Sequence, residues 1–184
     1  MSRAEWIGVN YVDDAFKSLL LDALLLKNDE LSSSLFGTPF SSKDVKLKQT
    51  LRRRIAYWPQ ALEEITTDHY LKAQEKLTGY SRNKVPQEVR LALDHLMIGD
   101  DLPDDLKRML YSLFMNAPDL LIIDNALVHY DDAITGKVLK YVSQYAKRTG
   151  LSILHLTKSQ EPLNYFKGRS FELQNKHLVE LVNH

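Results

Sequence analysis

The stretch Leu120-Leu-Ile-Ile-Asp-Asn-Ala-Leu-Val-His-Tyr-Asp131 decides the fold of this 184-residue chain. Its opening aliphatic run ends abruptly at Asp124, and a second carboxylate, Asp131, closes the stretch. A short aliphatic run bounded by polar residues is typical of a strand buried on both faces, as in a parallel sheet. An aspartate at the carboxyl edge of such a strand lies where α/β sheets bind ligands. A core strand followed by an ordinary polar turn is the alternative that this stretch leaves open.

A second segment, Leu51-Arg-Arg-Arg-Ile-Ala-Tyr-Trp-Pro-Gln60, favours the functional interpretation. It joins a basic turn to a short apolar strand that ends at Pro59, because proline has no N–H for the strand ladder. Gln60 is then free to project from the sheet edge. In nucleotide hydrolases, an aspartate at the end of a neighbouring strand holds magnesium, often through water.

Together these segments resemble the Q-loop and the Walker B strand with its D-loop in the ATP-binding cassette (ABC) ATPase family, the nucleotide-binding subunits of ABC transporters. Ser34–Phe40 and Leu151–Lys158 resemble the family's strand and turn before the Q-loop and the strand before its switch loop. The resemblance implies an α/β fold of the P-loop NTPase type. It assigns residues 1–60 and 102–184 to a layered sheet with helices, and residues 61–101 to a small helical subdomain that docks on a transmembrane partner.

The resemblance also implies where a nucleotide would bind. The family's phosphate loop, G-x-x-x-x-G-K-S/T, places its lysine and hydroxyl at Lys17 and Ser18. These two residues and Gln60 are therefore the candidates for nucleotide binding, and Ser18, Gln60 and Asp124 are the candidates for metal binding. Asp131 takes the D-loop position, which lies at a subunit interface in the family.

The phosphate loop itself departs from the family pattern. Its two flanking glycine positions hold Tyr11 and Phe16, although a glycine that needs positive φ or close ligand approach is poorly replaced by an aromatic residue. Asp13 and Asp14 would direct negative charge at the phosphates. One carboxylate about 4 Å from a phosphate charge costs roughly 4 kcal/mol at an effective dielectric of 20.

The other catalytic positions also differ from the family pattern. The family's catalytic glutamate is Asn125, which cannot act as a base, and its switch histidine is Lys158. The nearest counterpart of the L-S-G-G-Q signature needs a short deletion in the alignment and is acidic where the family has glycine. It comprises Leu102, Pro103, Asp104, Asp105 and Leu106.

Composition is compatible with one cytoplasmic domain. Lys plus Arg equals Asp plus Glu at 24 each, so no global charge indicates nucleic acid or a membrane surface. There is no cysteine, and the longest apolar run, Leu19 to Leu26, is broken by Asp22, so the chain is not expected to span a membrane. A basic run is interpreted as a solvated connection rather than a nucleic-acid site; it comprises Lys43, Lys46, Lys48, Arg52, Arg53 and Arg54.

The alternating pattern predicts particular elements. Strands are expected at residues 6–12, 31–36, 54–57, 120–124, 152–156, 170–173 and 177–181. Helices are expected at residues 17–27, 61–77, 85–98, 106–115 and 134–147, the last closed by Gly150. About ten residues precede the phosphate loop, too few for the family's N-terminal β-subdomain. We therefore expect an exposed sheet edge and apolar surface.

These features favour a degenerate ABC-type nucleotide-binding-domain homologue. It would be a non-hydrolysing subunit or partner of an ABC transporter, paired with a permease or a homologous ATPase subunit, in the cytoplasm or at the inner face of the cell membrane. No cofactor is expected beyond weak ATP and magnesium binding. A cytosolic interaction or regulatory protein on the same scaffold is the main alternative, and an active ATP-hydrolysing subunit is a third.

Overall fold

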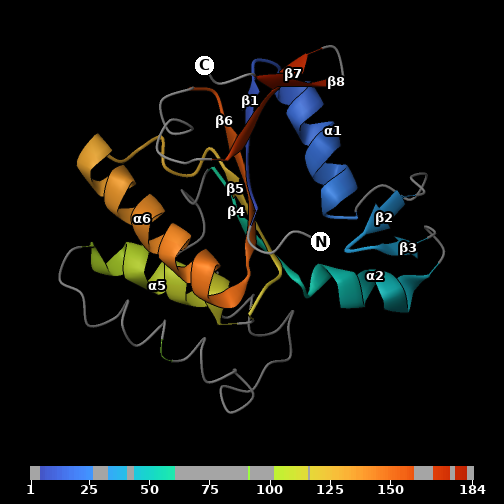
Figure 1. Cartoon of the computed structure of the whole chain (residues 1–184), viewed down its shortest axis with the longest axis horizontal. Coiled ribbons are helices and arrows are strands. Elements are labelled where there is room, and N and C mark those ends of the chain that lie inside the picture. The colour runs from blue at the N-terminus through green and yellow to red at the C-terminus, as the bar shows by residue number, and fades with distance from the viewer. Residues whose placement is uncertain are drawn as a thin grey trace.

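A six-stranded sheet forms the centre of the molecule in the computed structural model (Figure 1). The structure describes residues 5–26, 33–40, 44–60, 91, 102–115, 117–159, 168–174 and 177–181. Its strand order is β4-β5-β6-β1-β7-β8. The strands are β4 (Ile55–Trp58), β5 (Leu120–Asp124), β6 (Ser152–Thr157), β1 (Trp6–Tyr11), β7 (Arg169–Gln174) and β8 (His177–Leu181). All neighbours pair in parallel except β7 and β8, which are antiparallel.

This strand order gathers distant parts of the chain at one edge. Parallel strands all end at the same edge, so the carboxyl ends of β1, β4, β5 and β6 lie together. The register aligns Asp124 of β5 with Leu156 of β6, and Asn10 of β1 with Thr157 of β6. The residues that follow these strands are therefore neighbours although they are far apart in sequence.

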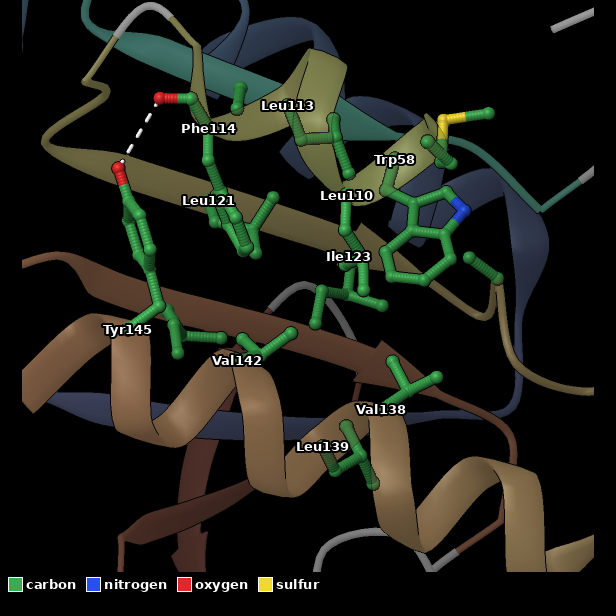
Figure 2. Close-up of a cluster of buried hydrophobic side chains, with 14 of the residues drawn as sticks. Trp58, Leu110, Leu113, Phe114, Leu121, Ile123, Val138, Leu139, Val142 and Tyr145 are labelled. Atoms are coloured by element: carbon green, nitrogen blue, oxygen red, sulfur yellow. Dashed lines mark hydrogen bonds between the residues drawn. The ribbon is translucent and has the colours of Figure 1, made fainter. Parts of the chain in front are cut away.

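One face of the sheet is covered by α5 (Asp104–Phe114) and α6 (Asp132–Thr149) (Figure 1). The core beneath them is shown in Figure 2, where the rings of Phe114 and Tyr145 stack with centroids 3.9 Å apart. The Tyr145 hydroxyl donates to the Phe114 carbonyl oxygen at 3.2 Å, which satisfies its polar end inside the core. The other labelled core residues are Trp58, Leu110, Leu113, Leu121, Ile123, Val138, Leu139 and Val142.

The opposite face packs against α1 (Asp14–Leu24). Alternation along the strands separates the two cores, because successive side chains point to opposite faces. Ile122 therefore belongs with α1, whereas its neighbours Leu121 and Ile123 belong with α5 and α6. The buried residues on the α1 side are Val9, Tyr11, Leu21, Ile122, Leu156 and Leu173.

The structure confirms the predicted α/β fold and most of the predicted elements, with shifted boundaries. α1 begins at Asp14 rather than residue 17, because Asp13 caps it and accepts from the Ala15 N–H at 2.7 Å. Likewise, Asp131 caps α6 by accepting from the Ile134 N–H at 2.8 Å, and Gly150 closes it with φ of 77°.

Part of the basic run is helical rather than an irregular connection, but its charged side chains are mostly solvated as predicted, since Lys46, Arg52 and Arg53 are exposed. α2 (Val45–Arg52) begins after Asp44, whose carboxylate accepts from the Leu47 N–H at 2.9 Å. Lys48 and Leu51 are buried on its inner side. β2 (Ser33–Leu35) falls within the strand predicted at residues 31–36, but its partner in the hairpin, β3 (Thr38–Phe40), was not predicted.

The predicted helical subdomain at residues 61–101 lies outside the described residues, apart from Leu91. Among the helices that the structure does describe, none has the length and apolar character needed to cross a bilayer.

Candidate functional site

A buried ion pair lies at the carboxyl edge of the sheet. Lys17 is in the first turns of α1, and its Nζ is 3.1 Å from Oδ1 and 3.4 Å from Oδ2 of Asp124 at the end of β5. The two side chains are only 11% and 4% exposed. The Tyr57 hydroxyl of β4 donates to Asp124 Oδ2 at 2.9 Å, so this carboxylate is held from two sides.

A second, more exposed pair lies beside the first. Lys158 follows the end of β6, and its Nζ is 2.7 Å from Asp14 Oδ2. This hydrogen bond, aided by the charges of Lys158 and Lys17, holds the pKa of the Asp14 carboxyl below its ordinary value. Asp14 Oδ1 is also 3.8 Å from Lys17 Nζ. The two pairs therefore form one network that joins α1 to the ends of β5 and β6.

The ring of Tyr11 lies near both lysines. Lys17 Nζ is 5.2 Å and Lys158 Nζ is 5.7 Å from its centroid, within the range of cation–π attraction. The ring is buried, and this burial, reinforced by the charges of Asp124 and Asp14, raises the pKa of the hydroxyl. We call Tyr11, Asp14, Lys17, Tyr57, Asp124 and Lys158 the charged cluster.

Two side chains at the start of α1 are engaged with the helix backbone. Asp13 accepts from the Ala15 N–H, which is one of the donors that a helix N-terminus offers to an anion. The Ser18 hydroxyl donates to the Asp14 carbonyl oxygen at 2.8 Å, one helical turn back, and so is directed at the helix backbone.

Two further predicted site residues lie at the same edge. Gln60 follows Pro59 two residues beyond the end of β4, the strand that neighbours β5. Asn125 directly follows β5 with a φ of 48°, and its N–H donates to the Leu156 carbonyl oxygen at 2.8 Å. Asparagine is one of the few residues that adopt this left-handed conformation readily. The backbone conformation at this position therefore explains why an asparagine follows β5.

The remaining predicted positions have visible structural roles. Asp131 is the exposed N-cap of α6. In the signature counterpart, Pro103 takes the N-cap position of α5, and Leu102 and Leu106 are buried in the core beneath α5 and α6. The backbones of Asp104 and Asp105 form the first turn of α5, while their side chains lie outside the described part of the structure.

The structure thus brings three predicted residues, Lys17, Asp124 and Lys158, into one cluster. Tyr57 was not predicted from the sequence as a site residue. The pairing of Asp14 with Lys158 was not predicted either. The alternation of side chains along the strands could have identified Tyr57, because Tyr57 points to the same face of the sheet as Ile122 and Asp124. Within the described residues there is no group of three or more His, Cys, Asp or Glu side chains arranged to hold a metal ion.

Comparison with known proteins shows similarity in fold. No protein-family profile matches the sequence, nor does any curated protein. Among solved structures, an ATP-binding subunit of an ABC transporter matches with a TM-score of 0.70 and 20% identity, covering 96% of this chain and 77% of that one. The cbiO1 subunit of the transporter complex cbiONQ from Clostridium perfringens matches with a TM-score of 0.73 and 16% identity, covering 96% of this chain and 76% of the other.

A third match is the dimeric structure of a bacterial ABC transporter cassette. Its TM-score is 0.72 at 10% identity, and the alignment covers 100% of this chain and 88% of that one. At such low identity the likeness concerns the backbone and strand order rather than particular side chains. The chain has the P-loop NTPase fold of the ATP-binding subunits of ABC transporters.

Proposed function

We propose that this chain is a non-hydrolysing homologue of the ABC ATP-binding subunits that works by protein contact, as a subunit or partner of an ABC transporter. The observation that carries the proposal is the ion pair between Lys17 and Asp124. The lysine that would reach a phosphate is held by the carboxylate that would hold magnesium, so the two charges are paired with each other.

The charged cluster is a poor fit for a magnesium triphosphate. To meet a phosphate, Lys17 would have to leave Asp124, and separating a buried pair costs several kcal/mol because each charge loses its partner. The two lysines of the cluster are balanced by Asp14 and Asp124, so an incoming anion meets no net positive charge. The ring of Tyr11 lies close to both lysines and adds bulk where the family has a glycine.

The two positions that supply the base and the switch residue in the family are both unsuited to activating water here. Asn125 carries a neutral amide, which cannot accept a proton from water at neutral pH. Lys158 is bonded to Asp14 and, as a cation, offers no acceptor. Residual nucleotide binding through Lys17, Ser18 and Gln60 would therefore be weak and would lead to no turnover.

We place the functional surface of the protein on parts of the chain away from the charged cluster. The helical subdomain that we assign to residues 61–101 would contact an ABC permease, and the segment around Asp131 would face a homologous ATPase subunit. With such partners the protein would be cytoplasmic, at the inner face of the cell membrane.

Phosphate release tests the lack of hydrolysis. Wild-type protein and the Asp124→Ala variant are incubated with ATP and excess magnesium, and inorganic phosphate is followed over hours. We expect both rates to equal the buffer background, because Lys17 is held by Asp124 and the family's catalytic glutamate position is Asn125. Magnesium-dependent release that the variant abolishes would contradict the proposal.

Capture from a native lysate that includes membranes tests the partner. We expect the tagged protein to recover a multi-span permease or an ABC ATPase, and the double variant Lys72→Glu/Lys76→Glu in residues 61–101 to lose it. Lys140→Glu, an exposed position on α6, is the matched control and should retain the partner. Recovery of a soluble protein alone would favour a cytosolic regulatory role and contradict the transporter assignment.

A further inference from the structure

A cavity of about 460 Å³ lies on the α1 side of the sheet. Its floor is formed by the strands, at Ile7, Leu120 and Leu154, and its walls include Leu24 of α1 and Phe36 of the β2–β3 turn. No residue of the charged cluster lines it. Ile7, Leu120 and Ser152 lie near the amino ends of their strands, whereas the charged cluster gathers at the carboxyl ends, so the cavity is a separate feature.

We propose that this cavity binds a small, uncharged, hydrocarbon-rich ligand. Its volume falls within the range of about 300–1,000 Å³ that is usual for ligand pockets. Its described lining is almost wholly aliphatic and aromatic, with the Ser152 hydroxyl and Glu5 as the exceptions. Because the Glu5 carboxylate lies 3.7 Å from Arg169 Nη1, it already has a cationic partner. A charged ligand would be desolvated here without compensation.

The surroundings favour a small molecule over a docking protein. Protein interfaces need a broad contiguous surface, on the order of 1,000 Å² or more in total. Among the exposed large apolar side chains in the described part of the chain, only Leu178 lines the cavity. The others lie elsewhere: Val12, Leu19, Val45, Leu91, Val128 and Val179. Most of the apolar side chains that line the cavity are therefore only partly exposed, as in a recess that is half open to solvent.

The walls are held by contacts that do not depend on a ligand. Phe36 lies under the Arg54 guanidinium, whose carbon is 4.1 Å from the ring centroid. Arg52 of α2 donates through Nε to the Leu25 carbonyl oxygen at 3.0 Å, which fixes the end of α1. Preformed walls lower the ordering cost of binding.

An uncharged fluorescent probe, N-phenyl-1-naphthylamine, tests the proposal in titrations of the whole chain. Ser152→Phe fills the floor of the cavity with a ring, and Ser152→Ala is its matched control, which keeps the space and removes only the hydroxyl. We expect saturable binding to the wild type and to Ser152→Ala at micromolar concentrations, and binding at least about tenfold weaker to Ser152→Phe.

Several results of these titrations would overturn the proposal. Equal probe binding by wild type and Ser152→Phe, or no saturable binding below about 100 μM, would overturn the proposal. Tighter binding of the sulfonated analogue 1-anilinonaphthalene-8-sulfonate would contradict an uncharged ligand. If Ser152→Phe fails to fold, Leu24→Trp fills the cavity from α1 and takes its place. A probe-free dimer that either filling variant splits would make a second copy the occupant and would also overturn the proposal.

Discussion

At the scale of single residues, Asp124 is the position on which the site depends. It accepts a hydrogen bond from Tyr57 and pairs with Lys17, and both charged side chains are almost inaccessible to water. A buried pair contributes little relative to an apolar substitute, but removing one partner leaves the other charge uncompensated. The unfolding of variants at this position therefore reports directly on the pair.

We predict that Asp124→Ala lowers the free energy of unfolding by about 3–5 kcal/mol, measured in urea, because Lys17 is left buried without a partner. The double variant Lys17→Met/Asp124→Leu should recover most of this loss, since both charges are removed together. As a control, Asp14→Asn should have a small effect, because the pair with Lys158 is exposed. A single variant as stable as the wild type would show that the pair does not form in solution.

His155 gives the protein a pH dependence that the sequence does not reveal. It lies in β6 against the edge of the Trp6 ring, and burial lowers its pKa from 6.5 to about 4. Between these values the unfolded chain binds a proton that the folded chain does not. As far as His155 is concerned, the free energy of unfolding is therefore highest above pH 6.5, and it falls as the pH drops from 6.5 toward 4.

We predict a loss of about 3 kcal/mol from this residue between pH 6.5 and pH 4, measured by urea unfolding across that range. The variant His155→Leu should lack this part of the pH dependence and unfold at neutral pH with similar stability, because leucine is apolar and of comparable size. An identical pH profile for the variant and the wild type would contradict the burial of a neutral imidazole.

At the scale of elements, α6 illustrates how local sequence sets a boundary. Asp131 accepts the Ile134 N–H at its start, and Gly150 adopts φ of 77° at its end. The acidic residue in the first turn and the basic residues in the last turn complement the helix dipole. Asp131 therefore has a structural role besides the interface role that we propose for it.

We predict that Asp131→Ala costs about 1 kcal/mol of stability because the cap is lost, and that Asp131→Ser costs distinctly less. Gly150→Ala should cost a similar amount, about 1–2 kcal/mol: a Cβ there meets open space, but the left-handed backbone is strained. Thermal unfolding measures all three. If Asp131→Ala matched the wild type in stability while losing a partner, the residue would serve the interface alone.

Sequence patterns predicted the strands and helices that have strong periodicity or clear caps, such as β1, β5, α6 and β6. They did not predict the helix α2, which lies in a segment interpreted as a solvated connection. The helix forms because Asp44 caps it and because Leu51 is buried on its inner side together with the stem of Lys48. A buried lysine such as Lys48 cannot be distinguished by composition from one in water.

At the scale of the whole molecule, the strand order creates the site. β6 lies between β1 and β5, so residues that are 107 positions apart, Lys17 and Asp124, meet at one edge. The sequence indicated each position through its resemblance to known motifs. It could not indicate that the two side chains would bond to each other, because that depends on the distances between strand ends and on the space that Tyr11 fills.

The central claim is that the protein's own carboxylates hold the lysines that would bind phosphate. Titration calorimetry of the wild-type chain with ATP and excess magnesium tests this claim most directly. We predict no binding tighter than about millimolar, where the free energy of binding is only about 4 kcal/mol. Saturable, magnesium-dependent binding at micromolar ATP would contradict the account, because it would show that Lys17 and Asp124 part readily to admit the nucleotide.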